Sequence, residues 1–307
     1  MYFILMDFFK RILLNRNSIL VLAVVAGVIL GNKAVYLKEF SFIALGLSMT
    51  FSMTGISLNS FRSIREISKP ALMAIFLNYI IFTAVLLTAA WFIIPDKTVY
   101  YGFVVIAAAP PGVAIIPFSY ILKGKVDYAI IGVTFAFISS LFFAPLIVNS
   151  FTTGQGISKY DLFLLMVQLI VVPLIVSQFL RLKPIFKYIE PIRGKVVDFG
   201  FAVIIFVAVG MNRDIFFTDL SLLIKIIIVL LIATLGIGTV FEMISRLLHN
   251  DKSLLVTQNM LVTIKSSGFS VFTSISLFGK EAAIPSAVLA IIVLIYLIYL
   301  SLRFKDY

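Results

Sequence analysis

Cysteine is absent from this chain, histidine and tryptophan occur once each, and charged residues make up only 13% of its 307 residues. A chain without cysteine can form no disulfide, thiol nucleophile or cysteine-ligated metal site. The zinc-protease motif HExxH is also missing, and neither paired acids nor a Ser/His set occurs at a usable spacing inside the apolar runs. We therefore predict that the protein is not an enzyme and holds no metal ion or cofactor.

Apolar residues dominate the chain, because 62% of it is hydrophobic and its mean hydropathy is +1.14. A soluble domain could not cover its surface with so few polar groups, whereas long apolar runs between short basic segments are typical of a polytopic membrane protein. We predict an all-α protein with a single membrane domain over residues 1–307 and ten transmembrane spans. The predicted spans are residues 18–34, 40–58, 70–94, 100–122, 128–150, 160–180, 197–212, 220–245, 252–279 and 282–302.

The net charge of +11 could suit a nucleic-acid-binding protein, but the basic residues flank the apolar runs and form no separate stripe with interleaved aromatics. With both termini inside, 17 of the 25 Lys and Arg residues fall on the inner side and six on the outer side, as the positive-inside rule requires. The opening sequence lacks the order of a signal peptide. We expect a protein of the bacterial inner membrane with cytoplasmic termini, which contacts lipid and binds no nucleic acid.

The spans divide into two halves, about residues 18–150 and 160–302, with five spans each. An odd number of spans in each half places the halves in opposite orientations, and this is the arithmetic of an inverted repeat. The segment RLKPIFKYIEPIRGKVVD, residues 181–198, is predicted to be a basic linker near the middle of the chain.

Helix-breaking residues interrupt the fourth and ninth spans, which occupy equivalent places in the two halves. The fourth span contains Pro110, Pro111 and Gly112, with Pro117 close behind, and the ninth contains KSSG at residues 265–268. A lone proline in a transmembrane helix usually only kinks it. Paired interruptions in corresponding positions instead indicate discontinuous helices and a transport site near the membrane centre.

Several motifs resemble those of the bile acid:sodium symporter family. PPGVAII at residues 110–116, running on to Gly124, resembles P-G-G-x-A-S-N with seven residues between its Asn and a following Gly, and LVTIKSSG at 261–268 resembles E-x-G-M-Q-N-x-G. FGKEAAIPSAVLAI at 278–291 and MTFSMTGISLNSFR at 49–62 are also similar to the family. The resemblance implies a core and a panel domain, with discontinuous helices 4 and 9 crossing in the core. It also implies organic-anion substrates, although related folds serve auxin efflux carriers and sodium/proton antiporters.

The resemblance further implies two sodium ions beside the crossing, but this sequence departs from the family at the ligands. Where the family has oxygen-bearing side chains, the chain has apolar residues, namely Ile115, Ile116, Ala129, Val133 and Leu261. A third-span amide is kept as Asn78, and the family's ninth-span Gln is replaced by Lys265. We therefore expect the sodium sites to be absent.

Lys265 is the most informative residue, because an ammonium inside the membrane is costly to bury and usually serves a function. It falls where a sodium ligand would be, so the ammonium could take the place of the ion. In one version Lys265 gains and loses a proton during transport, which gives proton coupling; in the other it stays charged, and the carrier needs no coupling ion or attracts the anion directly. The plainer alternative is that Lys265 extends to the membrane interface.

The residues after the fourth-span break bear on the substrate. A helix that starts near Gly112 would present free N–H groups to a carboxylate or sulfonate, and the apolar side chains around it favour an amphipathic anion. The predicted lining residues are Lys265, Asn78, Ser266, Ser267, Gly268, Pro110, Pro111, Gly112, Val113, Ile115, Ile116, Leu261 and Thr263, with Gln258, Asn259 and Asn212 as secondary candidates.

The leading hypothesis is a sodium-independent secondary transporter of an organic anion, with protons as a candidate coupling ion through Lys265. Two alternatives are a membrane sensor or scaffold that keeps the fold without transport, and an efflux carrier of the auxin-carrier type. Separately, Glu242 and Arg246 are four residues apart near the inner end of the eighth span, and we predict a local ion pair there.

Overall fold

The computed structural model describes residues 16–55, 64–152, 159–214, 217, 219–248 and 251–304. Within these ranges the chain is helical apart from short connections. An isolated antiparallel β-bridge joins Pro111 and Lys265. Residues 56–62 of the motif MTFSMTGISLNSFR lie outside the described residues, as do some of the basic residues counted for orientation. The prediction of an all-α protein is confirmed for the described residues.

The helices follow the apolar runs, as expected where no water is present to satisfy a broken backbone. The first half contains α2 (Arg16–Leu30), η1 (Gly31–Leu37), α3 (Lys38–Met53), α4 (Ile64–Ile75), η3 (Phe76–Ile81), α5 (Phe82–Ile93), α6 (Lys97–Ala108), α7 (Ile115–Ile121) and α8 (Val126–Phe151). The second half contains α9 (Lys159–Met166), η4 (Val167–Val171), α10 (Val172–Leu180), α11 (Lys183–Met211), α13 (Leu220–Leu231), η5 (Ile232–Gly236), α14 (Ile237–Leu247), α15 (Lys252–Thr263), α16 (Ser267–Phe278), η6 (Glu281–Ala283) and α17 (Ile284–Arg303).

Seven continuous helical stretches among the described residues are long and apolar enough to cross a membrane. They are Lys33–Met53, Glu66–Ile93, Val126–Phe151, Phe163–Leu180, Lys183–Met211, Leu220–Leu247 and Glu281–Arg303. Three shorter apolar helices, Ser18–Leu30, Lys97–Ala108 and Ser267–Phe278, fall where the first, fourth and ninth spans are predicted. The structure therefore agrees with a polytopic membrane protein, and the two predicted interruptions shorten the fourth and ninth segments.

Two pairs of segments share a pattern of lengths. Helices α4 and α13 have 12 residues each, and each runs into a π-helical turn, η3 or η5, before α5 or α14 continues. Helices α6 and α15 also have 12 residues each, and each stops at a break before a further helix begins. A π-helical turn widens the helix locally and is frequent at functional sites. The third and fourth segments of the first half thus match the third and fourth of the second half.

The segment predicted as a basic linker is helical from Lys183 onward and belongs to the 29-residue helix α11. This corrects the prediction of a linker, because residues 183–198 are part of a continuous helix. Pro184 is in the first turn, where a missing N–H costs nothing, and the helix continues through Pro191. Charged residues in this stretch therefore occupy faces of a helix and can line a cleft.

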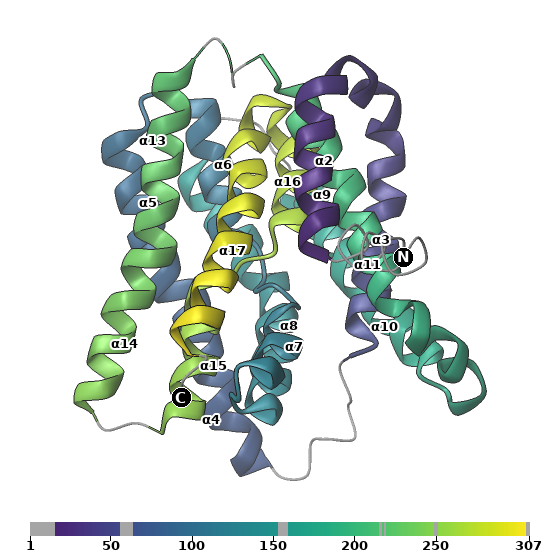
Figure 1. Ribbon diagram of the computed structural model, residues 1–307, viewed down its shortest axis with the longest axis vertical. Coiled ribbons are helices and arrows are strands. Elements are labelled where there is room, and N and C mark those ends of the chain that lie inside the picture. The colour runs from purple at the N-terminus through teal and green to yellow at the C-terminus, as the bar shows by residue number, and fades with distance from the viewer. Residues whose placement is uncertain are drawn as a thin grey trace, which may run out of the picture.

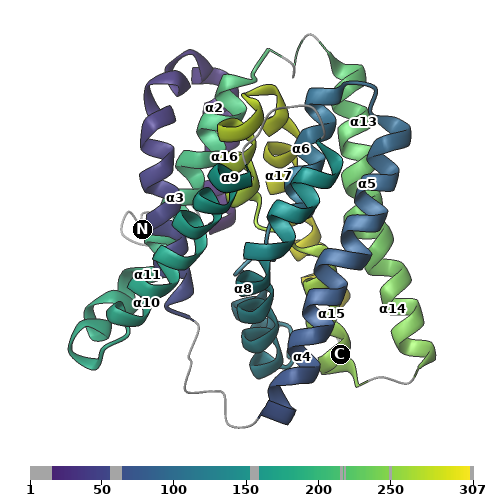
Figure 2. The ribbon, with the colours of Figure 1, turned by 180° about the vertical axis from the view of Figure 1, so that it is seen from behind.

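One group of helices lies at one side of the molecule, opposite α5, α13 and α14 (Figure 1). Helix α11 packs along α2, α3 and η1, and α10 packs on α3, which together make one group at the side of the molecule. The view from behind shows the same group beside α8, with α5, α13 and α14 on the far side of the molecule (Figure 2). Helices α6, α16 and α17 lie between these sides (Figures 1 and 2).

The predicted ion pair of the eighth span is confirmed. The guanidinium of Arg246 lies 2.6 Å from the Glu242 carboxylate, whose side chain is 8% exposed. Arg303, in the last turn of α17, reaches the same carboxylate oxygen at 3.4 Å. Glu242 therefore joins the ends of α14 and α17 as well as linking two turns of one helix.

Candidate functional site

The two breaks meet and satisfy each other's backbone. The N–H of Gly112 donates to the carbonyl of Ile264 at 3.0 Å, and the N–H of Ser266 donates to the carbonyl of Pro110 at 2.9 Å. These bonds flank the antiparallel bridge between Pro111 and Lys265. Buried backbone inside a membrane protein is tolerated when such partners exist. The helix breakers thus create a short two-stranded contact between segments that are about 150 residues apart in the sequence.

Glycine at position 112 allows the close approach. A Cβ atom there would lie 3.0 Å from the Ile264 Cγ2 atom and 3.3 Å from the Lys265 carbonyl oxygen. Both distances are shorter than ordinary van der Waals contacts, so a larger residue would push the two breaks apart. Pro110 and Pro111 fit because neither has an N–H that would need an acceptor.

The Lys265 side chain is 2% exposed and ends among oxygen atoms at the crossing. Its Nζ donates to Asn78 Oδ1 at 2.7 Å and to the carbonyls of Ala107 and Ala109 at 2.8 Å each. The rings of Tyr79 and Phe82 lie 4.8 and 5.0 Å from the same nitrogen, which is within the range of cation–π contacts. The alternative that Lys265 extends to the membrane interface is therefore wrong in this conformation.

Backbone geometry explains why carbonyls are available to the ammonium. Helix α6 ends at Ala108, and the last carbonyls of a helix have no partner within that helix. The C-terminal end of a helix also carries partial negative charge, which attracts a cation. Asn78 reaches the same point from the π-helical turn η3, and its amide Nδ2 donates to the Leu261 carbonyl at 3.5 Å. The end of α6 and the turn η3 therefore converge on the Lys265 nitrogen.

The number of acceptors matches the charged form of the lysine. An ammonium has three N–H donors and no acceptor, and it faces three acceptor oxygens. A neutral amine would turn a lone pair toward one of these oxygens, which is repulsive. No carboxylate in the described ranges forms an ion pair with Lys265, so the oxygens of neutral groups and the two rings surround the charge. A bound monovalent cation at this point would be surrounded by the same neutral oxygens.

The five positions that the family resemblance aligns with sodium ligands carry apolar side chains. The side chains of Ile115, Ala129, Val133 and Leu261 are each 0% exposed and belong to the hydrophobic core. Ile116 differs because it is partly buried and lines a pocket on the other side of the break. No oxygen-bearing side chain occupies any of the five positions, so their contribution to an ion cage is limited to backbone.

The polar residues of α15 form a second network, which does not include Lys265. Asn259 donates to the carbonyl of Gly238 at 2.8 Å and accepts from the Tyr296 hydroxyl at 2.5 Å, while Thr263 donates to the Asn259 carbonyl at 2.7 Å. This network joins α14, α15 and α17. The Asn259 side chain therefore links α15 to α14 and α17 through Gly238 and Tyr296, whereas Thr263 bonds to the backbone of its own helix.

The other candidate residues are distributed more widely. Gln258 donates to the Tyr128 hydroxyl at 2.7 Å, which links α15 to α8. Asn212, at the end of α11, donates to the carbonyls of Ala208 and Lys280 at 2.9 Å each and is not part of the crossing. Ser266 and Ser267 start α16, and Gly268 packs against α11.

A pocket of about 390 Å³ opens beside the fourth-segment break. The break contributes Val113, Ala114 and Ile116, and α11 contributes a face on the opposite wall. The remaining lining residues are Ser52, Gly55, Pro117, Phe118, Ile121, Arg193, Gly194, Val197, Asp198 and Phe201. The pocket thus lies between the α3–α11 group and the crossing, and most of its wall is apolar.

Arg193 and Asp198 are pocket residues that the sequence reasoning did not assign to a site. Both lie in the segment taken for a linker, and Arg193, Val197 and Phe201 recur every four residues, which is one face of a helix. The spacing would have revealed this face had a helix been predicted there. Phe201 also contacts the crossing, because a Cβ atom on Gly268 would lie 2.6 Å from its ring.

The family model described as the Sodium Bile acid symporter family matches residues 42–219, which is more than half of the chain. No curated protein matches the chain. The match includes Asn78, the break after α6 and the α11 wall of the pocket, and it confirms the resemblance drawn from the motifs. The chain therefore belongs to the sodium bile acid symporter family, a family of membrane transporters, and is an integral membrane protein.

Proposed function

We propose that this protein is a secondary transporter of an amphipathic organic anion that operates without sodium. The observation that carries the proposal is the binding of the Lys265 ammonium to three oxygens at the crossing of the two breaks. A tethered ammonium supplies the positive charge that a bound ion would bring, but it cannot be released into solution. The sodium gradient would then have no ion to move and could not drive the substrate.

The loss of ligand side chains supports the same proposal. Sodium requires several oxygens, and carbonyls alone would have to replace the side chains missing at Ile115, Ile116, Ala129, Val133 and Leu261. Two of the nearby carbonyls, those of Ala107 and Ala109, already accept from Lys265. A sodium ion at this point would therefore have to displace a covalently attached cation.

We further infer a ten-span architecture with an inverted repeat of five plus five spans in a single transporter domain. The matching lengths of α4–η3–α5 and α13–η5–α14 support it, as do the 12-residue helices α6 and α15 that precede the two breaks. The α2, α3, α10 and α11 group would be the panel, and the crossing would belong to the core as two discontinuous helices. The basic bias supports cytoplasmic termini, and the proposed location is a bacterial inner membrane.

The pocket of about 390 Å³ is the proposed substrate cleft. Arg193 offers a guanidinium suited to a carboxylate or sulfonate, and Val113, Ile116 and Phe201 offer apolar surface for the rest of the molecule. The N-terminus of α7 contributes less than the sequence suggested, because that helix has only seven residues. The Lys265 nitrogen is enclosed by its three acceptors and so would not contact the substrate directly. It would affect binding by holding the two breaks in place at the crossing.

Proton coupling through Lys265 is the second version of the mechanism. The match of three donors to three acceptors favours the charged amine that stays in place, so we give this version second rank. It would require the crossing to rearrange during transport and to free the nitrogen from its carbonyls. A proton gradient test separates the two versions directly.

Flux measurements in proteoliposomes test the proposal. We expect a radiolabelled bile acid, used as an amphipathic probe, to be taken up by exchange or down its own gradient, with the same initial rate in sodium and in choline buffer. An imposed proton gradient should change the rate by less than about twofold, whereas a larger effect would favour the titrating version. Sodium-driven accumulation of the probe would overturn the proposal, and empty liposomes serve as the blank.

The charge in the cleft gives a second expected result. Replacing Arg193 with Gln should reduce the initial rate of bile acid uptake about tenfold, because a charge-assisted hydrogen bond to the anion is lost. Lys195→Gln is the matched control, since Lys195 is exposed on the same helix and does not line the cleft. Equal rates for the two variants would remove Arg193 from the substrate site.

A further inference from the structure

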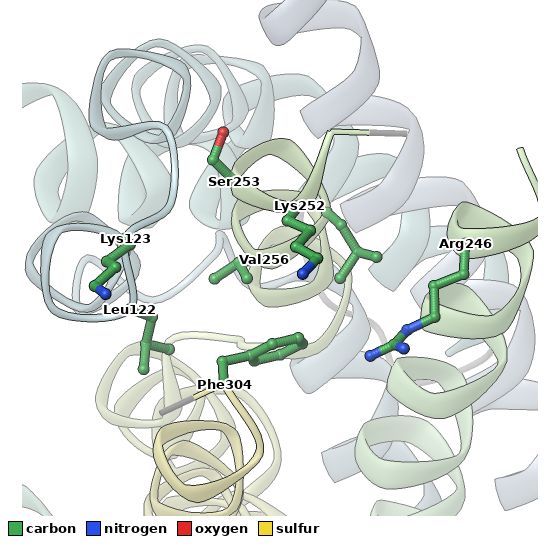
Figure 3. Close-up of a pocket in the computed structure, with 8 residues that line it drawn as sticks. Leu122, Lys123, Arg246, Lys252, Ser253, Val256 and Phe304 are labelled. Atoms are coloured by element: carbon green, nitrogen blue, oxygen red, sulfur yellow. The ribbon is translucent and has the colours of Figure 1, made fainter. Parts of the chain in front are cut away.

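A second pocket lies at one end of the helix bundle, apart from the crossing and from the proposed cleft. Its volume is about 230 Å³, and it is lined by Leu122, Lys123, Arg246, Lys252, Ser253, Leu255, Val256 and Phe304. The ends of α7, α14 and α17 and the start of α15 contribute these residues. Figure 3 shows Lys252 and Arg246 directed toward the opening beside Phe304, with Lys123 on the opposite side next to Leu122.

Positive charge is in excess at this pocket. Three of the eight lining residues are cationic and none is acidic. Arg246 shares the carboxylate of Glu242 with Arg303, so one negative charge serves two guanidinium groups. The nearby Asp251 does not reduce the excess, because its carboxylate lies 2.8 Å from the ammonium of Lys125, which is outside the lining. Among the described residues, the lining of this pocket would therefore attract an anion.

The other half of the lining is apolar. Leu122, Leu255, Val256 and Phe304 form a continuous wall beside the cations. A small hydrophilic anion would use only one side of such a pocket. A phosphate group that carries an apolar extension would use both, and at the end of a transmembrane bundle the bilayer itself supplies such molecules.

We propose that this pocket binds the phosphate of an anionic phospholipid, with Lys123 and Lys252 as the main phosphate contacts and the apolar wall against the glycerol and upper acyl chain. The positive-inside orientation places the pocket at the cytoplasmic leaflet, where anionic lipids attract basic residues. Bound lipid would link the turn after α7 to the start of α15, and so would stabilise the two broken segments relative to each other.

Thermal unfolding of the purified full-length protein in detergent tests the site. Phosphatidylglycerol should raise the unfolding midpoint at lower concentration than phosphatidylcholine, and the double variant Lys123→Gln/Lys252→Gln should need about tenfold more phosphatidylglycerol for the same rise. The matched control is Lys33→Gln/Lys97→Gln, which removes the same charge at η1 and at the start of α6, away from the pocket. The same unfolding measurement with inorganic phosphate tests whether the pocket binds a soluble phosphate in place of a lipid.

Each outcome decides the proposal. A selective loss in the pocket variant, with the control equal to wild type and both variants as stable as wild type without added lipid, would support it. The same loss in both double variants would mean a general surface-charge effect and would overturn it. Stabilisation by inorganic phosphate but not by phosphatidylglycerol would overturn the lipid as the source of the phosphate. If the pocket variant is unstable without lipid, native mass spectrometry of lipid retained by Lys123→Gln alone replaces the unfolding measurement, and unchanged retention would overturn the proposal.

Discussion

Replacing Lys265 with Met should lower the free energy of unfolding by about 3 kcal/mol, which corresponds to a fall of roughly 6 °C in the unfolding midpoint. Methionine fills a similar volume but has no donor, so Asn78 Oδ1 and the carbonyls of Ala107 and Ala109 lose their shared partner. Buried acceptors without a partner cost far more than the net worth of the bond they made. Thermal unfolding of the purified protein measures the change.

A matched control for this variant is Lys225→Met. Lys225 also lies in an apolar stretch, on α13, but it is partly exposed and makes none of the contacts that Lys265 makes. We expect its midpoint to stay within about 1 °C of the wild type, because surface substitutions usually change stability by less than 0.5 kcal/mol. Equal effects of the two substitutions would mean that the oxygens at the crossing do not need the ammonium.

Truncation to alanine gives the sharper test of the ammonium as a substitute for an ion. Lys265→Ala leaves the three oxygens and adds space, so a sodium ion with water molecules could enter. We expect sodium chloride to raise the midpoint of Lys265→Ala by roughly 2 °C or more over choline chloride, and to leave the wild type unchanged, since ligand binding to the folded state stabilises it. Stabilisation of the wild type by sodium would contradict the central proposal.

Gly102→Ala is the second substitution with a large expected effect. A Cβ atom at this position of α6 would lie 2.1 Å from the carbonyl oxygen of Ala282 and 3.1 Å from Pro285 Cδ. The clashing atom belongs to the backbone of η6 and cannot swing aside as a side chain would. We expect a loss of about 2 kcal/mol, as for other overpacked sites, and a greater loss for Gly102→Val.

The sign of this prediction is opposite to the usual effect of glycine replacement within a helix. Alanine is favoured over glycine by up to about 1 kcal/mol in an open helix position. Gly46, on α3, provides that open position, because a Cβ atom there has no neighbour within 4 Å. Gly46→Ala should therefore be neutral or stabilising in the same unfolding assay. A stabilised Gly102→Ala would refute the close packing of α6 on η6.

The site could be predicted from the sequence only where local chemistry determined it. The helix breakers at 110–112 and the KSSG segment at 265–268 indicated paired breaks, because proline and glycine act on the backbone wherever they stand. The replacement of Gln by Lys265 indicated a cation at the position of a ligand. Neither inference required a partner residue to be known.

The contacts of Lys265 depend on residues that no local signal connects. Ala107 and Ala109 contribute only carbonyls, which every residue has, and Tyr79 and Phe82 resemble any other aromatic residues in an apolar run. They become partners because α6 ends where η3 passes the second break. Asn259 shows the reverse case, since its polarity suggested a lining role and the fold pairs its side chain with Gly238 and Tyr296.

The sequence by itself determined the membrane environment, the apolar helices and the two break points. These follow from composition and from backbone preferences, which act over a few residues. Only the tertiary structure decided that residues 183–198 are helical, that Arg193 lines a cleft and that Lys265 ends among three oxygens. These features depend on packing between segments far apart in the chain, and neither hydropathy nor motif spacing records which segments will meet.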